Sequence, residues 1–489
     1  MKTAKTAKTA ITLIVILSSL ASMNTNAQLQ KSSSVTTNGA ISYTPSLTVT
    51  VNPNQIIGTN NLVLGTQLDW ERFHHFMDRP EYQQLAIEAN FKLIRVFDFR
   101  KISSYGYDNL MPCKQWPNEW DWTTVDALAN AIFSIGAEPL FCLGWARTPI
   151  NNYIPPGMPI NSATGLPDPE TYASYAQEWV KHFKEVGLPV KHYQIMNEPI
   201  FYFGWAYSSK LVYFADLWNA AAIAMRAQNP NILLSHDTLT IKFVLDYWID
   251  HGEDIDYLDF HKYDAEYAGE YTDEQMFNRA ETRQYETQGS FYGLDQARQI
   301  WFNARGKMLP TINSESNFDC AFETGSDEKI QQMTGAVWLA LSLRTGIIKG
   351  LNYHVYFEFS SSKSFQQSIG TGWGFGMINQ DNNQPWYPYY VNKMIGSNLA
   401  VEDQLLYTDS PTNDLRTLAW THNGKTNILL IHKVTTTTTI RLQGLDGQIN
   451  ISWIDNTIPY ENPRLQTQQI NANSQITLHG YTVALLQTA

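Results

Sequence analysis

The sequence has few cysteines, a shortage of basic residues and no apolar run long enough to cross a membrane. Three cysteines in 489 residues do not make a disulfide framework, because their number is odd and a chain of this length can bury a large core. The sequence does not decide whether Cys113 and Cys320 form a single disulfide. Lys and Arg number 34 against 46 Asp and Glu, and the net charge of −12 excludes nucleic acid as a partner held by a basic surface. Every apolar run is shorter than the roughly 20 residues of a bilayer-spanning helix.

Aromatic residues, in contrast, are abundant. The chain has 15 Trp, 26 Tyr and 22 Phe, and its hydrophobic content of 43% against 16% charged residues predicts a globular protein rather than a disordered one. Flat side chains fill protein cores, but Trp and Tyr also form platforms for the C–H faces of sugars. Composition alone leaves both roles open.

The N-terminus has the three-part pattern of a secretory signal peptide. Three lysines within the first eight residues precede the apolar run Ile11–Ala21, and small and polar residues follow as far as Ala27. We therefore expect cleavage near Ala27, a secreted or cell-surface protein, and a flexible lead over residues 28–45.

Eight apolar or β-branched runs alternate with helix-period segments through most of the chain. This alternation predicts parallel strands joined by crossover helices, and a count of eight favours a closed (β/α)8 barrel over residues 61–399. The glycine-rich fingerprint of a dinucleotide-binding sheet is missing. The predicted strands are Leu62–Trp70, Lys92–Arg100, Ala137–Trp145, Lys191–Glu198, Ile232–Thr238, Ile255–Asp264, Pro310–Ser316 and Gly350–Phe359, and the clearest helices are Tyr172–Val186 and Lys210–Gln228.

The C-terminal part of the chain has a different pattern. Helix periodicity stops near Leu399, and short alternating strands follow, which predicts an all-β sandwich over residues 400–489. An early strand within residues 46–60 is expected to join this sandwich. The predicted fold class is thus α/β, a (β/α)8 barrel with a C-terminal β-sandwich.

Polar residues end several of the predicted barrel strands. Barrel enzymes carry their chemistry at these ends, where the loops converge on one mouth. Pro199 should hold the preceding Glu198 in extended backbone. Two glutamates near one mouth cost desolvation, so stability gives little reason to place them there. The strand-end residues are Arg95 and Asp98 on the second strand, Trp145 on the third, Asn197 and Glu198 on the fourth, His261 and Tyr263 on the sixth, and Glu315 on the seventh.

A pair of glutamates can cleave a glycosidic bond. At a separation of about 5–5.5 Å one carboxylate attacks the anomeric carbon while the other protonates the leaving oxygen, whereas about 6.5–9.5 Å admits a water and inverts the configuration. The sequence leaves the separation open. We assign Glu315 as nucleophile and Glu198 as acid/base, with Arg95 and Tyr263 as donors that keep the nucleophile ionised.

Together these residues resemble clan A retaining glycoside hydrolases. The evidence is Ile195–Pro199 at the end of strand four, Glu315, Arg95 and the run Phe260–Tyr263; Gly374–Asn379 with the residues after it is similar to the barrel end of the β-xylosidase and α-L-iduronidase family. The resemblance implies the same catalytic roles for Glu198 and Glu315. It also implies that Asn197 bonds the sugar 2-hydroxyl or the nucleophile, and that Tyr263 and Arg95 hold Glu315.

The resemblance fails at one position and leaves several roles open. Many clan members have a tryptophan floor at the end of strand eight, where we place Tyr353 and His354, so Trp373 in the next loop is the substitute. Arg95, His261 and Trp145 could instead be structural. Glu358 could compete for the nucleophile's role. The neighbouring histidines His74 and His75, with Asp78, point in different directions, so no metal and no cofactor is predicted.

The sequence thus predicts a secreted retaining β-glycosidase without cofactor. Its expected partner is a neutral polysaccharide or oligosaccharide of xylan, glucan, mannan or galactan type, because the mouth loops carry Tyr, Trp and acidic residues rather than basic clusters. The alternatives are a non-catalytic glycan-binding protein on a glycosidase scaffold and a metal-assisted hydrolase.

Overall fold

The structure is a computed structural model, and it describes residues 47–69, 72–97, 111–145, 153–322, 324–368, 370 and 372–489. The predicted signal peptide, the lead over residues 28–45 and Asp98 lie outside the described residues. Within the described part, no helix combines the length and the apolar character that crossing a bilayer requires.

Eight parallel strands form the predicted (β/α)8 barrel. Their order in the sheet is β8-β7-β6-β3-β2-β11-β10-β9, and the two end strands close the ring through hydrogen bonds from Asp256 N to Leu234 O (2.9 Å) and from Leu239 N to Asp259 O (3.3 Å). Strands buried on both faces often read as near-continuous apolar runs, as Leu93–Phe97 does apart from Arg95, whereas Thr311–Asp319 is fully buried although most of its residues are polar. Each of the eight predicted runs overlaps one of these strands. The strands are β2 (Val63–Asp69), β3 (Leu93–Phe97), β6 (Glu138–Cys142), β7 (His192–Gln194), β8 (Leu233–Ser235), β9 (Leu258–Ala265), β10 (Thr311–Asp319) and β11 (Tyr353–Tyr356).

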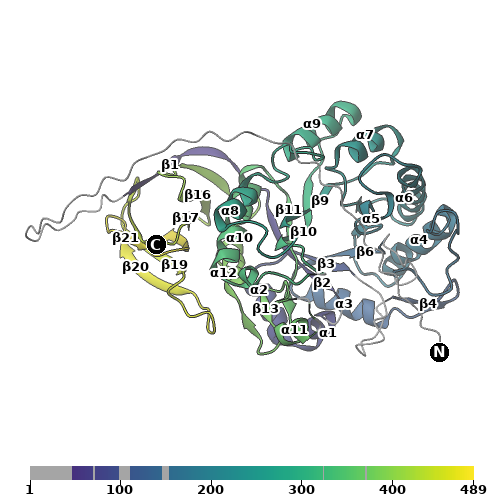
Figure 1. Ribbon diagram of the computed structural model, residues 1–489, viewed down its shortest axis with the longest axis horizontal. Coiled ribbons are helices and arrows are strands. Elements are labelled where there is room, and N and C mark those ends of the chain that lie inside the picture. Colours follow the sequence, from purple (N-terminus) through teal and green to yellow (C-terminus); the bar gives the residue numbers. More distant parts are fainter. Residues whose placement is uncertain are drawn as a thin grey trace, which may run out of the picture. The chain divides into compact units, whose positions relative to one another are not determined.

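Helices surround the barrel (Figure 1). Their apolar faces bury large aromatics such as Trp179, Trp218, Trp248 and Trp338, which are fully buried. The helices are α1 (Arg72–Asp78), α2 (Pro80–Glu88), α3 (Thr123–Ser134), α4 (Pro169–Glu185), α5 (Ile200–Phe203), α6 (Ser209–Gln228), α7 (Lys242–His251), α8 (Asp273–Thr282), α9 (Leu294–Arg305), the 3-10 turn η2 (Glu328–Gln331), α10 (Met333–Ile348), α11 (Lys363–Ser368) and α12 (Tyr387–Gly396). Short strands in the loops are β4 (Cys113–Gln115), β5 (Glu119–Trp120), β12 (Ser360–Ser361), β13 (Ile378–Asn379) and β14 (Gln384–Pro385).

The C-terminal domain is the predicted β-sandwich. Its strand order is β20-β19-β22-β17-β16-β15-β1-β18-β21, and the long strand β1 pairs antiparallel with β15 and parallel with β18. Figure 1 shows the curved course of β1. Ile428 and Leu430 face the sandwich core, while the alternating Leu429 and Ile431 pack into the barrel core. The strands are β1 (Leu47–Thr59), β15 (Gln404–Thr408), β16 (Leu415–His422), β17 (Lys425–His432), β18 (Thr438–Gln443), β19 (Gln448–Ile454), β20 (Gln466–Asn471), β21 (Ile476–Leu478) and β22 (Val483–Thr488).

All three cysteines are free, so the disulfide that the sequence left open between Cys113 and Cys320 does not form. Cys113 lies on β4, and Cys320 follows β10 at the barrel mouth. Burial raises the pKa of the Cys113 thiol to about 11 and that of Cys320 to about 12, which leaves both largely as unreactive thiols.

Candidate active site

A buried arginine organises the polar layer at the carboxyl ends of the strands. Arg95, on β3, is fully buried and donates to Gln194 Oε1 (2.7 Å), Asn197 Oδ1 (2.5 Å) and Glu315 Oε2 (2.7 Å), and also to Gln67. Burial would lower the pKa of the guanidinium, but the negative charges of Glu315, Asp237 and Asp259, together with the Cys142 thiol, outweigh it and the pKa is raised. Arg95 is therefore a fixed positive charge beneath the mouth.

Glu315 points into the barrel because β10 contains a bulge. Ile312 belongs to the small apolar cluster that fills the opposite end of the barrel, so strict alternation from Ile312 would turn Glu315 outward. The irregularity between Asn313 and Glu315 resets the alternation and brings Glu315 opposite His261 of β9. There its two carboxylate oxygens accept hydrogen bonds from Arg95 and from the hydroxyl of Tyr263.

Glu198 adopts a left-handed backbone conformation, with φ of 42°. The extended geometry predicted from Pro199 is therefore wrong, and β7 ends earlier, at Gln194. Such a conformation is costly for a glutamate and requires support from its surroundings. Asp237, beyond the end of β8, supplies it by accepting the Glu198 backbone N–H at 2.8 Å.

The two glutamates face each other across the mouth. One carboxylate oxygen of Glu198, one of Glu315 and a ring nitrogen of His261 lie within 4.8 Å of one another. Three such groups could also bind a metal ion, but both oxygens of Glu315 already accept hydrogen bonds, and the Arg95 cation lies 2.7 Å from one of them. A divalent cation would be repelled by this guanidinium, so the donor set fits a metal poorly.

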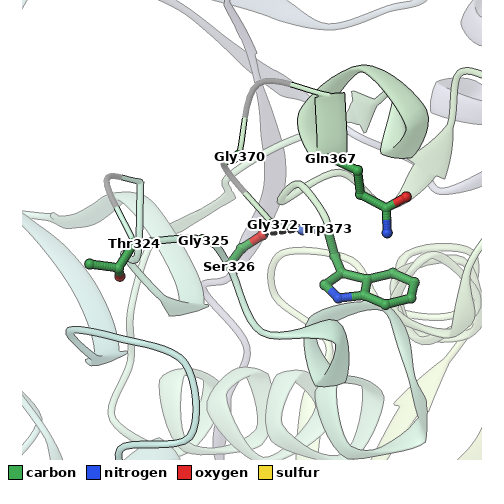
Figure 2. Close-up of a pocket in the computed structure, with 7 residues that line it drawn as sticks. All are labelled: Thr324, Gly325, Ser326, Gln367, Gly370, Gly372 and Trp373. Atoms are coloured by element: carbon green, nitrogen blue, oxygen red, sulfur yellow. Dashed lines mark hydrogen bonds between the residues drawn. The ribbon is translucent and has the colours of Figure 1, made fainter.

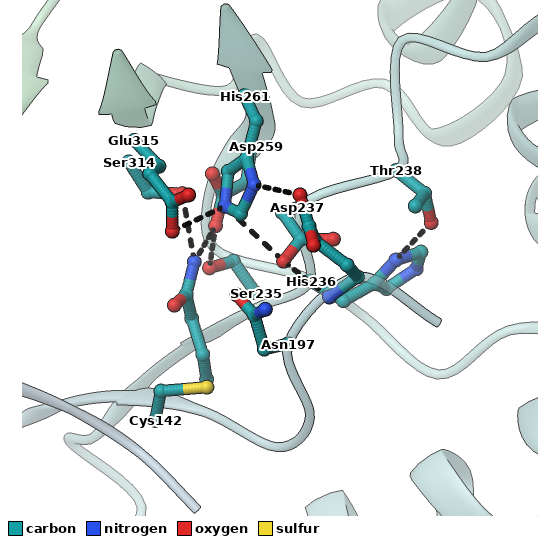
Figure 3. Close-up of polar contacts among 12 residues, drawn as sticks. Cys142, Asn197, Ser235, His236, Asp237, Thr238, Asp259, His261, Ser314 and Glu315 are labelled. Atoms are coloured by element: carbon teal, nitrogen blue, oxygen red, sulfur yellow. Dashed lines mark hydrogen bonds and ion pairs between the residues drawn. The ribbon is translucent and has the colours of Figure 1, made fainter. Parts of the chain in front are cut away.

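His261 connects both glutamates to Asp237. Its Nδ1 lies 3.0 Å from Glu198 Oε1, and its Nε2 lies 3.3 Å from Asp237 Oδ2 and 3.9 Å from Glu315 Oε2; Figure 3 shows the ring between Glu315 and Asp237. Burial would lower the pKa of His261, but these carboxylates outweigh it and raise the pKa to about 9. Burial, aided by the charges of Glu198 and Asp259, raises the pKa of Asp237 to about 7.

The shifts of Asp237 and His261 predict a pH-dependent stability. Both groups bind protons more tightly in the folded state, so the free energy of unfolding should fall as pH rises, from about 4 to 7 for Asp237 and from about 6.5 to 9 for His261. Each group contributes a slope of up to about 1.4 kcal/mol per pH unit. Asp237→Asn should abolish the fall in stability between about pH 4 and 7. It should also move the fall that His261 causes to lower pH, because one of the charges that raise the His261 pKa is removed.

Urea denaturation of the wild type and Asp237→Asn between pH 4.5 and 9 measures these slopes. Asp250→Asn, an exposed site on α7, is the matched control and should keep the wild-type profile. An unchanged profile in Asp237→Asn would contradict the assignment of the lower slope to Asp237.

The two predicted tryptophan platforms lie in different surroundings. Trp145 forms a parallel bridge with Asn197, beside the glutamates, and its ring contacts those of Phe97 and Tyr153. Trp373 instead lines a separate cavity of about 350 Å³ with Gln367, Ser326 and several glycines (Figure 2). Lys363 Nζ lies 3.6 Å from the centre of the Trp373 ring. Sugar binding by both tryptophans stays a prediction.

The predicted floor at the end of strand eight was misplaced. Tyr353 and His354 begin β11 rather than end it, and Tyr353 packs against His192 and Tyr257, residues of the opposite end of the barrel. The strand runs on to Tyr356, so Phe357 occupies the strand end. The ring of Phe357 lies 6.3 Å from that of Tyr263.

Glu358, the competing nucleophile, lies beyond the end of β11. Its side chain is fully buried. Glu198 and Glu315, in contrast, both reach the mouth, where each lies within 4 Å of a ring nitrogen of His261. The described geometry therefore favours Glu315 over Glu358 as the nucleophile.

Sequence reasoning missed Asp237 and the polar residues below the glutamates. Gln194 Nε2 donates to Asp259 Oδ2 (2.6 Å) and to Ser314 Oγ (2.9 Å), and Ser235 Oγ donates to Asp259 (2.6 Å). Burial raises the pKa of Asp259. The available signal was the run of four polar residues Ser235–Thr238 that directly follows the apolar part of the fifth predicted strand.

The chain was compared with known proteins. No family model matches the sequence, and no curated protein sequence matches it. Similar solved structures include a monomeric β-xylosidase from Caulobacter crescentus CB15 (12% identity, 90% of this chain and 99% of that chain, TM-score 0.62) and a glucosidase from Croceicoccus marinus (14%, 90% and 98%, TM-score 0.61). An α-L-arabinofuranosidase from Thermotoga maritima is similar over 91% of this chain and 100% of that chain, at 13% identity and a TM-score of 0.62.

These similarities cover the barrel and the sandwich together. At identities of 12–14% they show the fold alone. The resemblance to clan A glycoside hydrolases seen in the sequence is therefore confirmed at the level of architecture. The chain has the barrel-and-sandwich fold of β-xylosidase-like clan A glycoside hydrolases.

Proposed function

We propose that the protein is a retaining glycosidase that cleaves neutral β-linked glycans, with Glu315 as nucleophile and Glu198 as acid/base. The observation that carries the proposal is the approach of the Glu198 and Glu315 oxygens to within 4.8 Å. This distance supports direct attack on the anomeric carbon, because inversion needs a wider gap that admits a water.

The surroundings of Glu315 suit a nucleophile. Arg95 and Tyr263 donate to its two oxygens, which fixes the orientation of the carboxylate toward the mouth. Burial and the Glu315 charge raise the pKa of Tyr263 well above its usual value, so Tyr263 stays a hydrogen-bond donor. When the glycosyl–enzyme bond forms, these two donors remain beside the reacting carboxyl group, and Arg95 is itself held by Asn197.

The surroundings of Glu198 suit proton transfer. Its side chain is 21% exposed against 6% for Glu315, so it can exchange protons with solvent. It would protonate the leaving oxygen in the first step and take a proton from water in the second. The cation of His261, 3.0 Å away, stabilises the carboxylate that remains between these steps.

The aromatic side chains beside Glu198 support a neutral-sugar substrate. Trp145 is half-buried and Phe201 is 58% exposed, and such rings suit the C–H faces of neutral sugars. The similar structures act, by their names, on xylosides, glucosides and arabinofuranosides, which supports neutral sugars as a class. The lysine-led apolar segment at the N-terminus supports action outside the cytoplasm.

Covalent trapping tests the mechanism. A 2-deoxy-2-fluoro glycoside activated by a dinitrophenyl leaving group should label a single peptide, the one that contains Glu315, and the label should be found by mass spectrometry. A label on another carboxylate would overturn the assignment. A metal-assisted hydrolase would give no label and would lose activity in EDTA, and a glycan-binding protein would cleave no substrate.

Glu198→Ala should separate substrates by leaving group. We expect a loss of about 100- to 10,000-fold in kcat/KM with alkyl glycosides and little loss with 2,4-dinitrophenyl glycosides, because a good leaving group needs no proton. The kcat for the dinitrophenyl substrate should still fall, because the second step lacks its general base. Added azide should restore this kcat, because azide attacks the glycosyl–enzyme without needing a base. Equal losses on both substrates would contradict the acid role.

A further inference from the structure

The segment that follows Glu198 carries an unusual surface. Phe201, Trp205 and Tyr207 are 58%, 62% and 63% exposed, and they are the three most exposed large apolar side chains in the described part of the chain. All three lie within seven residues. Such a cluster of exposed aromatics indicates a binding surface rather than core packing.

This surface continues directly from the catalytic pair. The Phe201 N–H donates to the carbonyl of Glu198 at 3.0 Å, and its ring lies 6.5 Å from that of Trp145, which bridges to Asn197. Phe201 and Trp145 therefore flank Glu198 on the side of strands β6 and β7.

Trp205 extends the surface toward the next strand. Gly204 has φ of 80°, a left-handed turn that ends α5 after the buried Phe203 and leaves Trp205 exposed. The Trp205 ring lies 6.0 Å from that of Phe291, whose backbone bridges Ile241 in the loop after β8. The aromatic side chains thus extend from the loop after β6, through the loop after β7, to Phe291 between α8 and α9, which pairs with the loop after β8.

The chemistry of the pair decides which part of a substrate meets this surface. The anomeric carbon must contact Glu315 and the leaving oxygen must contact Glu198, so the sugar units beyond the leaving oxygen extend past Glu198 and away from Glu315. Pyranose rings present flat C–H faces that pack on exposed Trp and Phe rings.

We propose that Phe201 and Trp205 form a binding site for the leaving-group side of a glycan chain, where they pack against pyranose units beyond the cleaved bond. This inference rests on the proposed function and narrows it: the substrate is an oligosaccharide or polysaccharide with sugar on both sides of the bond, rather than a glycoside of a single sugar.

The test compares Trp205→Ala with wild type on two probes. The probes are the 4-nitrophenyl β-glycoside and the β-1,4-linked pentasaccharide of xylose, glucose, mannose and galactose. The comparison is made with the sugar that the wild type cleaves best. We expect kcat/KM for the pentasaccharide to fall about ten-fold, as for the loss of one aromatic contact, and kcat/KM for the nitrophenyl glycoside to stay within about two-fold. The bonds cleaved in the pentasaccharide should also shift, because fewer units are held beyond Glu198.

Two further variants control this comparison. Phe302→Ala removes a 41% exposed aromatic on the outer helix α9 and should change neither substrate, while Trp205→Phe should recover most of the pentasaccharide activity. An unchanged kcat/KM for the pentasaccharide in Trp205→Ala, or equal losses on both probes, would overturn the binding site while the proposed function stands. A wild type that cleaves neither probe would overturn the proposed function itself, and the leaving-group assignment with it.

Discussion

Glu315→Gln should lose glycosidase activity by about 100,000-fold while the protein stays folded, because removal of a covalent nucleophile leaves only binding and the remaining catalytic groups. Glutamine has nearly the same shape, and its amide oxygen can still accept from Arg95 or Tyr263, which both donate to Glu315. The measurement is kcat on the best nitrophenyl glycoside, with the melting temperature as the check on folding.

Glu358→Gln is the matched control for this prediction. Glu358 is also buried, two residues beyond the end of β11, and the sequence offers it as a competing nucleophile. We expect the kcat of Glu358→Gln to stay within about ten-fold of the wild-type value, because substitutions away from the reacting atoms act mainly through stability. Loss of activity in Glu358→Gln together with turnover in Glu315→Gln would reverse the assignment.

The architecture could be predicted because its signals are local. Some barrel strands are nearly apolar runs, such as Leu93–Phe97, and some strands of the sandwich alternate, as Gln448–Ile454 largely does. Others, such as the polar but fully buried Thr311–Asp319, could be placed only by their position in the alternation of strands and helices. Strand ends are also local, so the sequence could indicate which polar residues gather at the mouth. The structure brings together Arg95, Asn197, Glu198, His261, Tyr263 and Glu315 through the contacts described above.

The parts that could not be predicted depend on register and backbone irregularity. Glu315 faces inward only because of the bulge before it. None of the residues Asn313–Glu315 is of a type that predicts a bulge. The left-handed conformation of Glu198 overrides the preference set by Pro199, because Asp237 fixes its N–H from a neighbouring strand end. Asp237 itself belongs to no motif. Trp373 lies in a loop, where sequence gives no position relative to the glutamates.

Arg95→Met should lower the free energy of unfolding by about 3–5 kcal/mol and abolish most activity. The guanidinium is fully buried and donates to four residues. Its removal takes away the cation nearest to the buried carboxylate of Glu315 and leaves only His261, at 3.9 Å. Arg95→Lys keeps a charge but not the planar fork of donors, and it should fall between Arg95→Met and wild type. Urea denaturation and kcat measure the two effects.

A double-mutant cycle with Glu315→Gln decides where this loss originates. If the uncompensated charge of Glu315 causes most of it, Arg95→Met should cost much less in the Glu315→Gln background, since a neutral amide needs no cation. The unfolding free energies would then show a coupling of about 2–3 kcal/mol. Additive losses would mean that Arg95 acts through Gln67, Gln194 and Asn197 instead, as a hydrogen-bonding centre of the barrel rather than as the counter-charge of the nucleophile.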